Sequence, residues 1–210
     1  GRLRLGVGAG WMEREHRNYG WDLLTIPERM DRFEEGLEVI TRLLHYTNEP
    51  INFDGKYYHL EDATLLPRPR RPGGPPIVIG GNGPERTLPL VARYADEWNG
   101  VFLTPARYAE RNALLDQLLE DEGRRPEEVR RTLMTNLVFG RDEAELERQL
   151  DGGSAEELRE SGRVVGTPAE VVEQLNRLAE VGAQRVMLQW LALDDIDRLE
   201  TLAKTVLPQV

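Results

Sequence analysis

The chain opens with a stretch in which apolar and polar or small residues alternate with a period of two. Between Arg2 and Gly8 the apolar positions are Leu3, Leu5 and Val7. This alternation predicts a short β-strand that is followed by a Gly-rich turn. The period then changes, because the next apolar positions recur every three or four residues along a helix predicted from about residue 27 to 45. The stripe comprises Ile26, Met30, Phe33, Leu37, Ile40 and Leu44.

Two short runs of strand-forming residues come next and predict a β-hairpin. Residues 51–53 and 56–60 flank Asp54-Gly55, a pair that supplies the positive φ angles of a tight two-residue turn. Residues 67–76 are proline-rich and are expected to form an extended loop. We therefore expect an insertion of hairpin and loop at about residues 46–75.

The rest of the chain alternates regularly between strands and helices. Such alternation predicts an α/β fold with about five parallel strands joined by right-handed crossovers, in one domain over residues 1–210. A closed barrel needs eight strand-helix units, so the repeat is short by about three. The predicted strands after the hairpin are 76–79, 97–102, 132–139 and 184–190, and the predicted helices are 84–95, 105–121, 142–150, 154–160, 168–181 and 194–206.

Composition excludes several classes of function. With 210 residues, 40% of them hydrophobic and 30% charged, the chain can bury a core. A net charge of −10 argues against a nucleic-acid surface. The absence of cysteine excludes disulfides and fits a reducing cytoplasm, and His16, His45 and His59 lack metal-ligand spacing. No apolar run reaches membrane-span length and no signal peptide is recognisable, so we expect a cytoplasmic protein without a metal. Either the first strand begins at residue 2 or upstream sequence is missing.

The junction between the predicted strand 76–79 and the following helix has the composition of a phosphate site. The strand runs through Gly80-Gly81-Asn82-Gly83 into Pro84, which fits the first position of a helix, with Gly83 or Asn82 as its cap. Backbone N–H groups at a helix N-terminus hold phosphate readily. A Gly-rich turn that has only a steric purpose is the alternative interpretation.

The first turn invites comparison with the dinucleotide-binding fingerprint. Gly6, Gly8 and Gly10 are similarly spaced, but Glu13 stands where the third glycine belongs, and we expect no helix to begin at this turn. We therefore set the fingerprint aside.

Several segments together, in this order and spacing, resemble the bacterial luciferase-like flavin or deazaflavin oxidoreductases. The likeness covers about residues 1–100, and Val165-Gly166-Thr167-Pro168 extends it. The segments are Gly1 to Trp11 with Glu15-His16 and Gly20, Arg29 to Glu35, Phe53 to Tyr58, Leu66 to Pro69, Pro75 to Gly81, and Arg93 to Asn99.

The resemblance implies a TIM (β/α)8-type barrel, here partial, because the first strand corresponds to the family's fourth and the three N-terminal strand-helix units are absent. It implies an oxidoreductase or monooxygenase that uses reduced flavin (FMN) or coenzyme F420 on a small organic substrate. Gly80, Gly81, Asn82 and Gly83 would hold the cofactor phosphate, with Arg86 and Thr87 as added donors. Gly8, Ala9 and Gly10 would lie against the flat ring. Within the resemblance, Glu15-His16, Arg86-Thr87 and Ala95-Asp96-Glu97-Trp98-Asn99 lean toward the F420-using branch.

No catalytic residue is assigned from the sequence. In the resemblance, Trp11 stands where some deazaflavin-dependent relatives carry an acidic proton donor. Glu13, Glu15 and His16 are then the nearby candidates for an acid or base. The alternative for His16 is a position on the surface without a catalytic role. Trp98, Asn99 and Trp190 are expected either to line the pocket or, for the tryptophans, to belong to the core.

Two other functions stay open. An incomplete set of strands leaves open edges, which predicts a dimer or another covering of the edge, and favours a non-catalytic or structural fragment as one alternative. A phosphosugar-type barrel enzyme without a redox cofactor is the other, because phosphate sites at helix N-termini are widespread.

Overall fold

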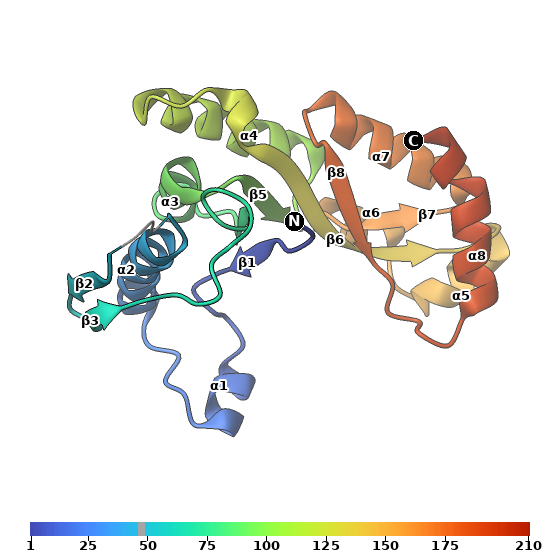
Figure 1. The fold of residues 1–210 in the computed structure, drawn as a ribbon. Helices are drawn as coiled ribbons and strands as arrows, with labels where there is room; N and C mark the ends of the chain where they lie inside the picture. The colour runs from blue at the N-terminus through green and yellow to red at the C-terminus, as the bar shows by residue number, and fades with distance from the viewer. Residues whose placement is uncertain (46–48) are drawn as a thin grey trace. The chain divides into compact units, whose positions relative to one another are not determined.

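The computed structural model describes residues 1–45 and 49–210, which form two compact units, Gly1–Glu97 and Trp98–Val210. Each unit is described by itself. Strands and helices alternate along most of the chain, as predicted (Figure 1). The elements of the first unit are β1 (Leu5–Val7), α1 (Glu13–Tyr19), α2 (Ile26–His45), β2 (Ile51–Asp54), β3 (His59–Ala63), β4 (Ile77–Gly80) and α3 (Thr87–Tyr94).

The first unit is built on the parallel pair β1 and β4. Its core comes from α2, β4 and α3, whose apolar stripes are buried against one another. The predicted stripe of α2 is only partly buried, since Met30 and Leu37 are in the core while Ile26 is 65% exposed. The buried apolar residues of the unit are Met30, Leu37, Val39, Ile77, Ile79, Leu88, Leu90, Val91, Ala92 and Ala95.

The second unit contains the remaining elements. They are α4 (Pro105–Asp121), η1 (Pro126–Glu128), β6 (Arg130–Phe139), α5 (Glu143–Leu150), α6 (Ala155–Glu160), β7 (Val164–Gly166), α7 (Pro168–Glu180), β8 (Arg185–Gln189), α8 (Ile196–Thr205) and η2 (Leu207–Gln209), while β5 (Glu97–Val101) begins at the last residue of the first unit. The short strand β7 is not in the sequence prediction, because three residues are too few to show a period.

β6 is the central strand of the second unit. It pairs in parallel with β8 over residues 132–136 and with β7 over residues 137–139. The helices α7 and α8 cover this sheet (Figure 1), and their side chains meet those of the strands in one apolar cluster. Its buried members are Leu137, Phe139, Val164, Val171, Leu202 and Val206.

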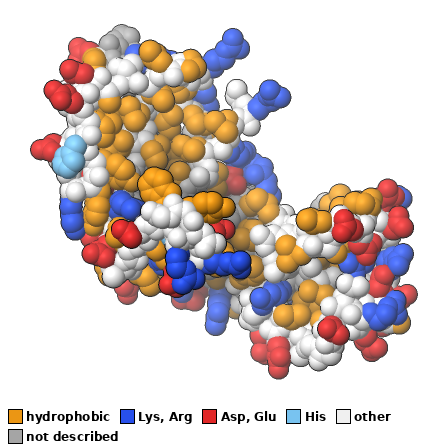
Figure 2. All heavy atoms as spheres, turned by 90° about the horizontal axis from the view of Figure 1, so that it is seen from below, with side chains coloured by type: hydrophobic (Ala, Val, Ile, Leu, Met, Phe, Trp, Pro, Cys, Tyr) orange, Lys and Arg blue, Asp and Glu red, His pale blue; other side chains and the backbone are white. Residues whose placement is uncertain are grey.

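Large apolar side chains are exposed on the first unit. Trp11, Tyr19 and Trp21 are each more than 70% exposed, and no residue of α1 is buried. Apolar side chains gather over a broad part of this unit in Figure 2. Because soluble monomers rarely expose large contiguous apolar areas, this surface is a candidate contact region.

The hairpin between α2 and β4 is present, but its turn differs from the prediction. β2 and β3 pair antiparallel with Asp54 opposite His59, so four residues connect the strands instead of two. Neither Asp54 nor Gly55 has a positive φ angle. The prediction of a tight two-residue Asp-Gly turn is therefore wrong.

A carboxylate of α2 determines this connection. Glu35 accepts backbone N–H groups from Lys56 at 3.0 Å, Tyr57 at 2.8 Å and Tyr58 at 2.7 Å. A Cβ on Gly55 would lie 2.2 Å from a Glu35 carboxylate oxygen, so glycine permits the close approach. Partial burial raises the pKa of Glu35, but the three N–H donors outweigh it and lower that pKa below its ordinary value.

We expect Glu35→Gln to lower the melting temperature by a few degrees near neutral pH, because an amide cannot accept three N–H groups as well as a carboxylate. A lowered folded pKa stabilises the protein above the ordinary carboxyl value of 4.5 and loses this effect as the pH falls through the folded value. The difference between wild type and variant in thermal unfolding should therefore shrink between pH 6 and pH 3. Glu38→Gln, on the same helix and paired with Arg42, is the control. A difference that does not change with pH would contradict this role of Glu35.

Candidate functional site

The two predicted glycine turns begin at the same edge of the first unit. β1 and β4 are parallel and pair Leu5 with Ile77 and Val7 with Ile79. Gly8 follows Val7, and Gly80 follows Ile79. The register therefore brings both turns to the carboxyl edge of one strand pair, which is the edge where parallel α/β proteins place their ligands.

The turn after β4 depends on glycine at two positions. Gly81 has a φ of +123°, which disfavours other residues. Gly83 has an ordinary φ, but a Cβ there would lie 2.9 Å from the Thr87 hydroxyl oxygen. Thr87 thus lies close to both glycines, and the backbone of residues 81–83 forms a narrow cradle beneath its side chain.

The helix after this turn begins later than predicted. α3 begins at Thr87 with Arg86 as its N-cap, and residues 84–86 form a turn before it, so Pro84 is not the first helical residue. The carbonyl of Gly83 accepts the N–H groups of both Thr87, at 3.0 Å, and Leu88, at 2.9 Å. Those two helical N–H groups are already bonded, so a phosphate would meet the loop before the helix.

Arg86 already has an anionic partner. Its guanidinium lies 2.6 Å from the Asp31 carboxylate and 3.9 Å from that of Glu34, both on α2. Arg86 therefore joins α3 to α2, and it would contact a phosphate only by exchanging or sharing these partners.

His16 lies beside the turn after β1. Gly10 has a φ of +82°, and a Cβ there would lie 3.1 Å from the His16 ring. The ring Nδ1 is 3.0 Å from the Met12 carbonyl oxygen, and the residue is half-buried. His16 thus lies against the turn that carries Gly8, Ala9 and Gly10.

Contrary to expectation, a helix does begin near this turn, since α1 begins at Glu13. Met12, at its N-cap, makes no side-chain capping bond. The absence of a helix therefore no longer separates this turn from the dinucleotide fingerprint, but the missing third glycine still does.

A cavity of about 360 Å³ lies beside this first turn. Its lining includes Gly8 and Ala9 from the turn and Tyr58 from the hairpin loop. Two arginines, Arg29 and Arg32, also line it, and the sequence prediction assigned neither to a site. The spacing of these arginines could have indicated a shared surface. The α2 residues that line the cavity recur at intervals of about three or four positions, so they share one helix face.

The aromatic residues left open by the sequence belong to cores. Trp98 is fully buried and stacks on Tyr108 with ring centroids 5.1 Å apart. Trp190 contacts the apolar cluster of the second unit and lies under the Arg198 guanidinium at 5.1 Å. Asn99 donates to the Thr132 hydroxyl at 3.0 Å.

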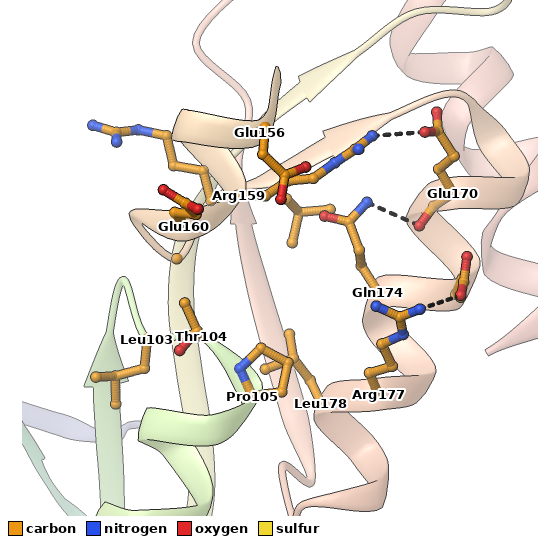
Figure 3. Close-up of a pocket in the computed structure, with 14 residues that line it drawn as sticks. Leu103, Thr104, Pro105, Glu156, Arg159, Glu160, Glu170, Gln174, Arg177 and Leu178 are labelled. Atoms are coloured by element: carbon orange, nitrogen blue, oxygen red, sulfur yellow. Dashed lines mark hydrogen bonds and ion pairs between the residues drawn. The ribbon is translucent and has the colours of Figure 1, made fainter. Parts of the chain in front are cut away.

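A second cavity, of about 400 Å³, lies among α4, α6 and α7 of the second unit (Figure 3). Charged side chains line it, and they are largely paired with one another. Arg159 is 2.7 Å from Glu170, and Arg177 pairs with Glu173. The cavity contains none of the residues that the sequence assigned to a site, and four glutamates and three arginines line it.

Over residues 1–45 and 49–210, no cluster of three or more histidine, aspartate or glutamate side chains is arranged to hold a metal ion. None of the helices in these ranges is both long and apolar enough to span a bilayer.

Parallel strand-helix units with glycine turns at their carboxyl edge define an α/β protein of the barrel-forming class. The luciferase-like monooxygenase family model matches residues 1–162, and the chain belongs to this family.

Curated relatives carry related names. An F420-dependent glucose-6-phosphate dehydrogenase of Intrasporangium calvum is 28% identical over 99% of this chain and 70% of its own length. The enzyme with the same name from Nakamurella multipartita is 32% identical over 94% of this chain and 56% of its length. A phthiodiolone/phenolphthiodiolone dimycocerosates ketoreductase of Mycobacterium kansasii is 32% identical over 72% of this chain and 40% of its own length. The chain thus spans about half the length of most of these relatives.

Solved structures share the fold at lower identity. An F420-dependent secondary alcohol dehydrogenase, in complex with an F420-acetone adduct, superposes with a TM-score of 0.76 at 20% identity over 90% of this chain and 64% of that chain. The monooxygenase RslO1 from Streptomyces bottropensis superposes with a TM-score of 0.76 at 20% identity, over 99% of this chain and 69% of that chain. These similarities confirm the predicted fold class, a TIM-barrel type built from parallel strand-helix units.

The narrow cradle at Gly83 generates a steric prediction. Gly83→Ala should lower the free energy of unfolding by roughly 1–3 kcal/mol, because the added methyl meets the Thr87 hydroxyl. The double variant Gly83→Ala/Thr87→Ala removes the obstructing atoms and should be more stable than the sum of the single effects predicts. Urea denaturation of all four proteins gives this coupling directly. Strictly additive effects would show that the two side chains do not meet.

Proposed function

We propose that the chain forms the phosphate-binding part and one side of the ring-binding part of a site for FMN or coenzyme F420 in an oxidoreductase. The observation that carries the proposal is the register of β1 and β4, which places two glycine turns at one edge. Family membership supports it, as do the relatives named for F420.

The phosphate end would be formed by residues 80–83 and Thr87. Gly81 and Gly83 give the ligand access to backbone, and the Thr87 hydroxyl offers a side-chain donor. A phosphate at this turn would also attract the Arg86 guanidinium. Arg86 is held by Asp31 nearby, so we propose for it a secondary role.

The ring end would lie against Gly8, Ala9 and Gly10. These small residues allow a flat ring to approach the backbone, and His16 lies beside the same turn. When bound, the cofactor would supply hydride transfer or oxygen activation, and the protein would supply position and exclusion of water. The substrate would be a small organic molecule.

The exposed edge and the apolar surface of the first unit support a second part of the proposal. β1 is the end strand in its sheet, and exposed strand edges tend to pair with other chains. Trp11 and Trp21 add exposed apolar area. We therefore propose that the protein forms a dimer.

Binding of FMN, F420 and riboflavin, followed by absorbance and fluorescence, tests the cofactor site. Gly81→Asp should weaken FMN binding roughly 10- to 100-fold, to the level of riboflavin, because its carboxylate repels the phosphate and removes charge-assisted hydrogen bonds. Riboflavin, which lacks the phosphate, should bind both proteins equally.

Gly123→Asp is the matched control. It also replaces a glycine of positive φ, +69°, with no atom within 4 Å of the new Cβ, and it lies at the end of α4 outside the proposed site. Unchanged FMN affinity in Gly81→Asp would refute the phosphate site. Failure of the wild type to bind either cofactor would refute the cofactor proposal for this chain.

A further inference from the structure

The cavity beside the first turn has an uncompensated positive charge. Arg29 and Arg32 are half-buried, and among the described residues neither guanidinium has an ion pair or side-chain hydrogen bond. Other arginines on or against α2 are paired, as Arg86 is with Asp31 and Arg93 with Glu34. Two adjacent unpaired guanidinium groups in a chain of net charge −10 form a local site for an anion.

The carboxylates nearest in sequence are occupied elsewhere. Glu28 accepts a hydrogen bond from the Thr25 hydroxyl at 2.6 Å, Asp31 pairs with Arg86, and Glu34 pairs with Arg93. Glu35 holds the hairpin loop. Every acidic residue in this part of α2 therefore has another partner, which leaves the charge of Arg29 and Arg32 available to a ligand.

The other walls of the cavity are apolar or small. Phe33 and Ile40 come from the same helix face as the arginines, and Tyr58 closes the lining from the hairpin loop. Gly36 lies next to that tyrosine, since a Cβ there would be in ordinary contact, 3.4 Å from the Tyr58 ring. The cavity therefore combines a cationic part with an apolar part, which suits a small molecule that carries one anionic group on an apolar body.

We infer that Arg29 and Arg32 bind the carboxylate or phosphate group of a small organic anion in this cavity. The identification of this anion as the substrate rests on the proposed function, because Gly8 and Ala9 border both the cavity and the proposed ring end of the cofactor site. The substrate of the enzyme is then an organic anion whose charged group is held by these two arginines. The anion site itself requires no cofactor, so it is tested separately.

The test compares benzoate with benzamide, which has the same shape but no charge. Protein-detected NMR titrations without cofactor should show benzoate binding to the wild type at least about tenfold more tightly, since hydrogen bonds to charged groups are worth roughly 1.5–3 kcal/mol. Arg29→Gln/Arg32→Gln should abolish this preference, and Arg29→Lys/Arg32→Lys should keep part of it. Raising the salt concentration should weaken the binding of benzoate and leave the binding of benzamide unchanged.

Arg42→Gln provides the matched control. Arg42 lies on the same helix, pairs with Glu38, and is absent from the cavity lining. Its variant should bind benzoate as the wild type does, and thermal unfolding should show that all variants fold. Equal binding of benzoate and benzamide by the wild type would overturn the inference. A double variant that still prefers benzoate to benzamide would also overturn the inference. So would a double variant whose oligomeric size changes while it binds benzoate normally.

These outcomes separate the inference from the proposed function. A wild type that prefers benzoate but binds neither FMN nor F420 keeps the anion site and loses the cofactor site. A wild type that binds FMN but shows no preference for benzoate keeps the cofactor site and loses the assignment of the substrate class.

Discussion

The candidate site depends on the parallel pairing of β1 with β4. Residues 8–76 separate the two strands along the chain, yet a register that pairs Val7 with Ile79 puts Gly8 and Gly80 at the same edge. A shift of one residue would turn the side chains of β4 to the opposite faces and separate the turns. The burial of Ile77 and Ile79 on one face of β4 fixes this register, so packing of the core positions the site.

Much of the fold could be predicted because its signals are local. The helices α4 and α7 begin at Pro105 and Pro168, where the sequence predicts them, because proline fits the first position of a helix. The hairpin turn could not be predicted in this way. Its shape is set by Glu35, a residue that lies about twenty positions earlier, and no local rule for Asp-Gly contains that carboxylate.

The site shows the same division between local and distant effects. The sequence predicts the glycine turn at positions 80–83, and the structure gives two of its glycines a reason, a positive φ angle at Gly81 and a close approach of Thr87 at Gly83. The partners of the charged residues could not be predicted, since they come from elements that meet only in the fold. Arg86 was predicted to contact phosphate and pairs with Asp31, whereas Arg29 and Arg32 were given no role and line the cavity next to Gly8.

The central claim is that the two glycine turns form one cofactor site, and amide NMR of protein labelled with ¹⁵N-glycine tests it most directly. Saturating FMN should shift the signals of Gly8 and Gly10 together with those of Gly81 and Gly83, and in the Arg29→Gln/Arg32→Gln variant inorganic phosphate should shift only the second pair. If FMN moved only one pair, or left all four signals in place while shifting those of distant glycines such as Gly123, the two turns would not form one site.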